Sequence, residues 1–234
     1  RQYETQNLQF AEMREDADLK EYLDRTTFIN KDGEVCEFTD LQKHDLNLVL
    51  QKRYALLNWQ QGSGKTAAVY HRAKYLLKFR KARNVIILAP AIATNMTWIP
   101  FLTVNKERFR TIQTAGDLDN IPEGTFLVVS TSMLRKLKRG LKRFIKRTSG
   151  KLCLVFDESD EITNPTSQRT RNILCIFRRF RYKILDTGTT TRNNIAELYS
   201  QFELLYNNSV NMICWSPQVY HENRDHEIEE ENNP

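Results

Sequence analysis

The sequence lacks the features that mark membrane proteins and zinc proteins. No apolar run approaches the ~20 residues that a transmembrane helix needs, so we expect no membrane partner. The four cysteines are widely separated and form no CxxC pair, which argues against a zinc site and fits a reducing compartment. We therefore expect an intracellular protein that is not secreted.

What the chain has instead is an excess of basic residues. Its 234 residues carry a net charge of +6 at pH 7, although the final stretch HENRDHEIEEENNP is acidic. The body of the protein is therefore more basic than the total suggests, which favours an anionic partner such as nucleic acid. The length suits one large domain with an ample core.

From about residue 40, apolar runs alternate with segments of helical periodicity. The expected strands are YALLNW, NVIILAP, TFLVVS, KLCLVFDE and YKILDTGT. The expected helices include LQKHDLNLVLQK, KTAAVYHRAKYLLKF, MLRKLKRGLKRFIKR and SQRTRNILCIFRRF. Strands that are apolar on both faces and separated by helices predict an α/β fold with a mostly parallel central sheet and helices on both faces. Ligands bind such sheets at the carboxyl ends of the strands.

The stretch NWQQGSGKTAAVY places Gly-x-Gly-Lys-Thr between an expected strand and an expected helix. Glycines let backbone N–H groups turn toward phosphate oxygens, and the helix N-terminus favours the same anion. The pattern predicts a phosphate loop in which the lysine reaches the terminal phosphates and the threonine binds Mg²⁺. Its residues are Gly62, Ser63, Gly64, Lys65 and Thr66. The structural alternative is a glycine-rich turn with an incidental lysine.

The stretch LVFDESDEITNP runs from an apolar strand directly into four acids. A phosphate-loop enzyme needs a carboxylate to hold Mg²⁺, usually through water, and Asp157 suits that role together with Thr66. It also needs a group that orients or deprotonates the attacking water, and Glu158 suits that catalytic role. A capped strand end leading into an acidic loop is the structural alternative. We expect Glu161 to be an ordinary solvated acid.

Together the two motifs resemble the first motor lobe of superfamily 2 helicases and translocases, in which DESD corresponds to a DExD-type box. Three further stretches resemble the Snf-type (Swi/Snf-like) translocases of double-stranded DNA: VIILAPAIATNMTWIPF, FLVVSTSMLRK and DTGTTTRNNIAELYSQFELL. The resemblance covers roughly residues 40–205. It implies a RecA-like P-loop NTPase lobe that hydrolyses ATP with Mg²⁺ to move along or remodel double-stranded DNA, with Lys65 and Glu158 as catalytic residues.

The resemblance also assigns two further groups of residues. Those that would couple hydrolysis to the grip on DNA are Asp160, Thr187, Gly188 and Thr189. Those that would contact the phosphate backbone of the DNA are Thr94, Asn95, Ser130 and Thr131. Trp98 falls where a helix would pack inward, and we expect it in the core. The basic run LRKLKRGLKRFIKR is either the solvated face of a helix or a positive track for DNA.

Four positions depart from the Snf-type pattern. Asp160 stands in place of the usual histidine and Thr190 in place of proline. Trp59 replaces a small residue at the entrance of the phosphate loop. Asp45 stands where the family has a glutamine that reads adenine, so the sequence leaves selectivity for adenine open.

A complete motor of this kind has a second lobe, whose arginines stabilise the transferring phosphate. After residue 205 the chain contains one more apolar run, VNMICW, and then the acidic stretch. We therefore expect a second lobe to come from the same longer protein or from a partner chain. The predicted organisation is a helical extension (1–35), the ATP-binding lobe (36–215) and an acidic tail or linker (216–234). The alternative function is a non-catalytic module that keeps the fold and binds nucleic acid or protein.

Overall fold

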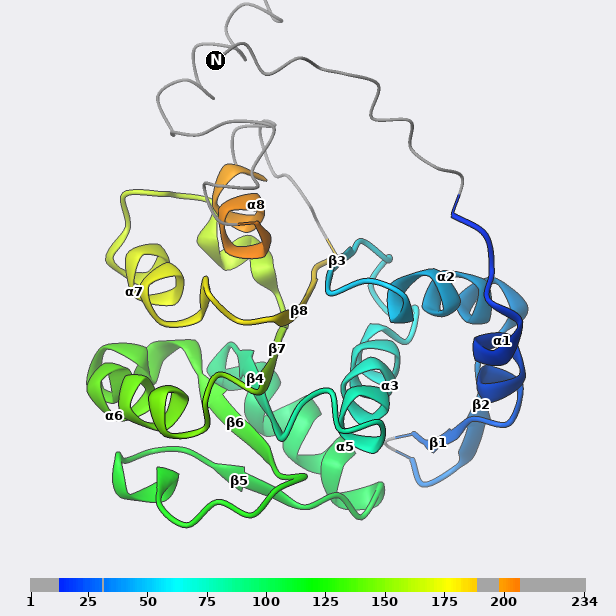
Figure 1. Ribbon diagram of the computed structural model, residues 1–234, viewed down its shortest axis with the longest axis horizontal. Coiled ribbons are helices and arrows are strands. Elements are labelled where there is room, and N and C mark those ends of the chain that lie inside the picture. Colours follow the sequence, from blue (N-terminus) through cyan, green and yellow to red (C-terminus); the bar gives the residue numbers. More distant parts are fainter. Residues whose placement is uncertain (1–12, 31, 189–197, 207–234) are drawn as a thin grey trace, which may run out of the picture.

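A computed structural model describes residues 13–30, 32–188 and 198–206, with a six-stranded sheet at its centre (Figure 1). The strand order is β3-β8-β7-β4-β6-β5, and every neighbouring pair is parallel. The strands are β3 Tyr54–Leu57, β4 Asn84–Ala89, β5 Phe109–Thr111, β6 Phe126–Ser130, β7 Leu152–Phe156 and β8 Tyr182–Asp186. This confirms the predicted parallel sheet.

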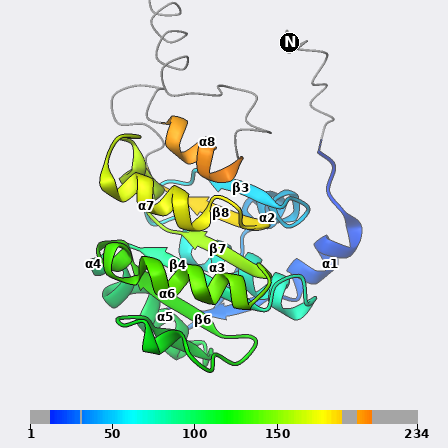
Figure 2. The same cartoon turned by 60° about the vertical axis from the view of Figure 1, so that its left-hand side comes forward.

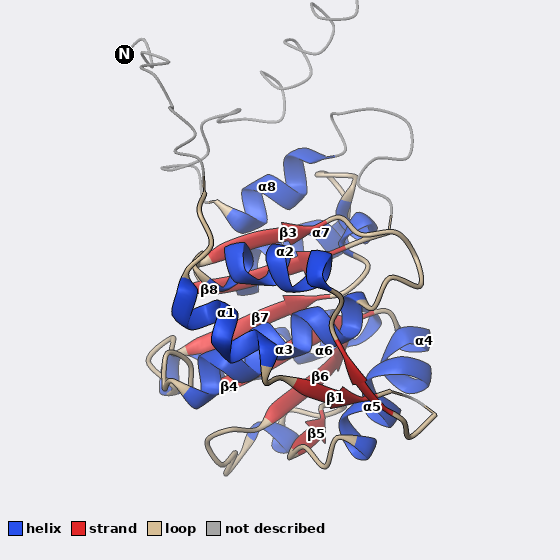
Figure 3. Cartoon of the chain, turned by 90° about the vertical axis from the view of Figure 1, so that its right-hand side faces the viewer, coloured by secondary structure: helices blue, strands red, loops and turns tan. Residues whose placement is uncertain are grey.

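Helices cover both faces of the sheet, as predicted. On one face lie α1 Ala17–Asp24, α2 Asp40–Leu50, α3 Lys65–Lys78 and α5 Ile99–Val104 (Figure 3). On the other lie α6 Leu134–Arg147, α7 Gln168–Phe177 and α8 Tyr199–Leu205 (Figure 2). None of the described helices has both the length and the apolarity to cross a bilayer.

Strand β4 shows why these apolar runs fold as buried strands. Val85 and Ile87 belong to the apolar cluster under α3, whereas Ile86 and Leu88 belong to the cluster under α6. All four side chains are fully buried. Successive side chains of a strand point to opposite faces, so a strand covered on both sides must be apolar at every position.

The predicted N-terminal extension contains one described helix, α1, followed by a hairpin. The hairpin strands, β1 Thr27–Ile29 and β2 Val35–Glu37, pair antiparallel, and the second strand crosses the predicted boundary at residue 35. Leu19 and Leu23 of α1 join the apolar cluster that includes β4 and α3. The described part of the extension therefore packs on the lobe. Residues 1–12 and the predicted acidic tail lie outside the described residues.

A buried arginine fixes α3 to the segment that leads into β3. Arg72 is 1% exposed, and its Nη2 donates to the carbonyls of Lys52 and Arg53 at 2.9 and 2.8 Å. These two acceptors offset part of the cost of burying the guanidinium, whose Nε has no hydrogen-bond partner among the described residues. Because β3 and α3 flank the phosphate loop, this contact ties together the elements on both of its sides.

Candidate nucleotide-binding site

The phosphate loop lies between β3 and α3, at the carboxyl edge of the sheet. Gly62 and Gly64 have φ angles of 82° and 80°, in the left-handed region where a side chain is strained. Gly64 is the N-cap of α3, so Lys65 and Thr66 occupy the first helical turn. The backbone therefore has the form that the glycine pattern predicts, with a helix N-terminus behind it.

Lys65 folds back on its own loop. Its Nζ donates to the carbonyl oxygens of Trp59 at 3.0 Å and Gln60 at 3.2 Å. A Cβ atom at position 188 would lie 3.4 Å from this Nζ, so Gly188 packs directly against the lysine. The structure thus brings together Lys65 and Gly188, which are far apart in the sequence.

Gln42 of α2 forms a hydrogen bond with the phosphate loop, a contact that the sequence did not predict. Its Nε2 donates to the carbonyl of Ser63 at 2.8 Å, while its Oε1 accepts from the backbone N–H of Thr39. Thr39 and Gln42 also form the capping box that begins α2. The Thr-x-x-Gln spacing predicts the helix cap from the sequence, but it does not predict the contact with the phosphate loop.

Two of the departures from the family pattern are partners of each other. The indole Nε1 of Trp59 donates to Oδ2 of Asp45 at 2.8 Å. The resemblance predicts an adenine-reading glutamine at position 45; here Asp45 accepts a hydrogen bond from the residue at the entrance of the phosphate loop. The two substitutions therefore form one local arrangement that joins α2 to the loop.

Asp157 follows β7 and is held by a tryptophan from the neighbouring segment. The Trp98 Nε1 donates to Oδ2 of Asp157 at 2.7 Å, and Trp98 is fully buried, as predicted. Trp98 ends a single turn of π-helix, Thr94–Trp98, a form that often occurs at functional sites. Burial raises the pKa of the Asp157 carboxyl above its usual value, while the Trp98 hydrogen bond opposes that shift.

Glu158 has a strained backbone. Its φ of 54° and ψ of 53° place a non-glycine residue in the left-handed region. Its side chain is half-buried at the same edge of the sheet as the phosphate loop. Strain of this kind costs about 1–3 kcal/mol and tends to persist where surrounding structure requires it, as at active sites.

The rest of the DESD box connects to other elements. Oγ of Ser159 donates to Oε1 of Gln201 on α8 at 2.9 Å, and Oγ1 of Thr187 donates to Oδ1 of Asp160 at 3.3 Å. The box is therefore in direct contact with the segment that follows β8. Thr189 and Thr190 lie outside the described residues.

The expectation that Glu161 is a solvated acid is wrong. Its Oε1 pairs with Nη1 of Arg169 at 3.1 Å, and its side chain is only 20% exposed. Glu161 lies in the turn Ser159–Ile162, and its partner Arg169 lies on α7. Glu161 therefore serves as a local structural contact.

The four candidate DNA-contact residues lie where β4 and β6 end, and these strands are neighbours in the sheet. Asn95 is exposed and Ser130 is half-buried, with its Oγ 2.8 Å from Oγ of Ser132. Thr94 and Thr131 are only 3% and 5% exposed. Asn95 and Ser130 are thus the two of these four residues whose side chains reach the surface.

Helix α6 presents a basic face, with apolar residues such as Leu137 and Leu141 turned to the core. Two of its cations already have partners: Lys138 donates to Asn172 Oδ1 at 3.0 Å, and Arg147 donates to the Leu118 carbonyl at 2.6 Å. The exposed basic residues are Arg135, Lys136, Arg139, Lys142, Arg143, Lys146 and Arg147. Both readings of this run, solvated face and nucleic-acid track, agree with that geometry.

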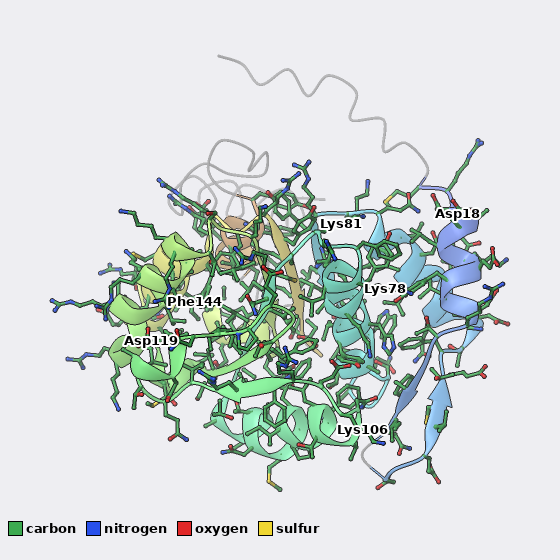
Figure 4. The ribbon with its side chains drawn as sticks, turned by 60° about the horizontal axis from the view of Figure 1, so that its bottom comes forward. Asp18, Lys78, Lys81, Lys106, Asp119 and Phe144 are labelled. Atoms are coloured by element: carbon green, nitrogen blue, oxygen red, sulfur yellow. The ribbon has the colours of Figure 1, made fainter. Side chains whose placement is uncertain are left out.

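A hollow of the described surface lies away from these motifs. It measures about 920 Å³ between α1 and α3, with Asp18 and Lys78 among its lining residues (Figure 4). Gly124, before β6, and Thr27 of β1 also line it. This hollow lies at the amino ends of the strands, whereas the motifs meet at the carboxyl ends. The hollow is therefore not assigned to nucleotide binding, despite its volume.

The donor set at the carboxyl edge fits a hydrated divalent cation. Thr66 offers a hydroxyl on the first turn of α3, and Asp157 offers a carboxylate at the end of β7. Hard oxygen donors of these types are those that Mg²⁺ prefers, and the ion usually keeps several waters. Within the described residues there is no cluster of three metal-ligating side chains, so phosphates and water would have to complete the shell.

The sequence of residues 21–192 matches the family model described as "Type III restriction enzyme, res subunit". The chain belongs to this family. The match covers well over half of the chain and includes the phosphate loop, the DESD box and Gly188. Membership confirms the predicted first motor lobe of a superfamily 2 helicase or ATPase.

A curated relative and solved structures agree with the family. The chain is 28% identical over 177 residues to the ATP-dependent helicase FUN30 of Saccharomyces cerevisiae, covering 70% of this chain and 15% of FUN30. The Sulfolobus solfataricus SWI2/SNF2 ATPase core in complex with dsDNA has a TM-score of 0.64 at 15% identity, over 80% of this chain and 38% of that one. The UvsW helicase of bacteriophage T4 has a TM-score of 0.57 at 14% identity, over 83% and 68%. The chain thus spans only a small part of FUN30.

Proposed function

We propose that this chain is the ATP-binding lobe of an ATP-dependent motor that moves along or remodels double-stranded DNA inside the cell. The hydrogen bond between Asp160 and Thr187 carries the proposal, because it joins the DESD box to the segment expected to transmit hydrolysis. The packing of Gly188 against Lys65 joins that same segment to the phosphate loop. The similarity to FUN30 and to the SWI2/SNF2 core supports the proposal that the motor acts on double-stranded DNA.

Each residue of the site has a chemical task in this proposal. The backbone N–H groups of Gly62, Ser63 and Gly64 surround the phosphates, and Lys65 leaves its carbonyl acceptors to bind the terminal phosphates. Thr66 and Asp157 would hold a hydrated Mg²⁺, which would supply positive charge beside the phosphates. Glu158 orients the attacking water and accepts its proton.

The coupling follows from the contacts of the segment after β8. Loss of the terminal phosphate changes what Lys65 binds, and Gly188 lies against that lysine. Thr187 transmits the change to Asp160 through their hydrogen bond. We include Thr189 in the same segment because it follows Gly188 directly.

We expect replacement of Lys65 by Ala to weaken ATP binding about ten-fold or more, since a charge-assisted contact to phosphate is lost. Lys78→Ala is the matched control, because Lys78 is an exposed lysine at the far end of the same helix. Binding of a fluorescent ATP analogue measures both variants. Equal affinity of the wild type and Lys65→Ala would reject the assignment of the phosphate loop.

We further propose that DNA phosphates meet Asn95, Ser130 and the first turn of α6. Arg135 and Lys136 are exposed and lie near the carboxyl end of β6, whereas Lys146 lies at the opposite end of α6. A rise of 1.5 Å per residue separates the two ends by roughly 15 Å. We therefore place DNA that crosses the carboxyl edge against the first turn of the helix and away from Lys146.

Removing both cations by Arg135→Ala and Lys136→Ala should weaken binding of duplex DNA several-fold. The slope of log K against log salt should become shallower by up to about 2, since each lost phosphate contact contributes about 0.9. Fluorescence anisotropy at several salt concentrations measures both quantities. The control is Lys146→Ala, which should change neither. An equal loss from Lys146→Ala would point to non-specific attraction by the whole basic face.

A further inference from the structure

Asp186 occupies a central place in the sheet that neither the motif pattern nor the family assigns. It is the last residue of β8, and its backbone pairs with Leu57 of β3, shortly before the phosphate loop. On the other side β8 pairs with β7, where Leu185 lies opposite Phe156 and Asp157 comes next. Asp186 is therefore located between the phosphate loop and the DESD box.

The carboxylate of Asp186 is fully buried at 0% exposure. Neither of its oxygens has a hydrogen-bond partner from another described residue. Buried polar atoms are nearly always hydrogen-bonded, and an orphaned group often indicates an ion or water that binds there. Burial, with the nearby charges of Asp157 and Glu158, raises the pKa of Asp186 well above its usual range.

The charges around Asp186 limit what could satisfy it. Asp157 and Glu158 are acids, and Lys65 is the cation that favours its ionised form. Lys65, however, donates to the carbonyls of Trp59 and Gln60, and it must bind phosphate when a nucleotide arrives. A hydrated divalent cation meets the need, because its bound waters donate hydrogen bonds to carboxylates that do not touch the metal.

We propose that Asp186 positions the divalent cation of the bound nucleotide by accepting a hydrogen bond from its water shell, as a second buried carboxylate beside Asp157. The inference rests on the proposed nucleotide site. Because the described residues contain no three-ligand metal cluster, the cation binds only together with the nucleotide. Asp186 acts through water on the cation and is a positioning residue.

The test measures Mn²⁺ affinity without relying on turnover. The 234-residue chain is mixed with ADP, and free Mn²⁺ is followed by electron paramagnetic resonance, while ADP affinity is measured separately in a metal chelator. We expect Asp186→Asn to weaken Mn²⁺ binding in the ADP complex about ten-fold. This is the smallest loss of metal affinity that is usual when a residue that hydrogen-bonds to a metal's ligands is replaced. ADP affinity in the chelator should change less than about two-fold, since the nucleotide contacts remain.

Two further variants separate this role from a structural one. Asp186→Leu removes the carboxylate altogether and should show the same loss of Mn²⁺ affinity, which guards against a folding defect in the Asn variant. Glu161→Gln is the control, since its acid pairs with Arg169 and should leave Mn²⁺ affinity unchanged. Wild-type Mn²⁺ affinity in both Asp186 variants would overturn the inference. Failure of the wild type to bind ADP at all would instead overturn the proposed function, and this inference with it.

Discussion

Replacing Glu158 by Gln is expected to slow ATP hydrolysis by about 10²–10⁴-fold while ATP affinity stays close to that of the wild type. A general base contributes an acceleration of that size, and the amide cannot accept the proton of the attacking water. Glutamine has the same shape as glutamate, so it meets the same left-handed backbone geometry. The measurement is phosphate release with and without duplex DNA, on the chain together with the second lobe that the resemblance implies.

The control for this prediction is Glu161→Gln, three residues away and paired with Arg169. It should hydrolyse ATP at nearly the wild-type rate. Turnover that survives Glu158→Gln would remove Glu158 from the catalytic role. Absence of DNA-dependent turnover in the wild-type protein would favour the other function, a module that keeps the fold without catalysis.

Trp98→Ala is expected to lower the free energy of unfolding by about 3–5 kcal/mol, the range for deleting a large buried aromatic side chain. Trp98 is fully buried and packs near Phe101 with ring centroids 6.5 Å apart. Its loss leaves both a cavity and an Asp157 oxygen without its indole donor. Chemical denaturation followed by circular dichroism measures the change.

Trp98→Phe separates packing from the hydrogen bond, because it keeps an apolar ring but lacks the N–H. We expect it to retain most of the stability and to reduce ATP hydrolysis, since Asp157 is then less firmly held. Trp59→Phe is the matched control for stability alone, because it removes an indole hydrogen bond from a half-buried residue. A loss below about 1 kcal/mol for Trp98→Ala would contradict the packing argument.

The sheet could be predicted from the sequence because strands buried on both faces form unbroken apolar runs. The strands that were missed lack this signal: β5 has three half-buried residues, and β2 alternates between exposed and half-buried ones. The hairpin of β1 and β2 therefore gives no strand signal in the sequence. Short strands of this kind are fixed by their neighbours in space, which a local pattern does not contain.

The site was only partly predictable, for a similar reason. Local spacing identifies the phosphate loop, because its backbone geometry depends on Gly62 and Gly64. The contacts that hold the site join distant segments, as Trp98 does with Asp157 and Gln42 with the Ser63 carbonyl. Trp59 and Asp45 each looked like an isolated departure, and only the structure shows that they are hydrogen-bonded.

The position of Lys65 has a consequence for the release of product. The ammonium group donates to the carbonyls of Trp59 and Gln60, so the loop contains acceptors that would compete with a nucleotide for Lys65. The affinity for nucleotide would then reflect the difference between the contacts of Lys65 with phosphate and its contacts with the two carbonyls. When the nucleotide leaves, the ammonium group would regain the carbonyl contacts and would not be left unpaired. Product release often limits the rate of enzymes. If the chain hydrolyses ATP as we propose, a loop that supplies its own replacement acceptors would shorten the time for which ADP stays bound.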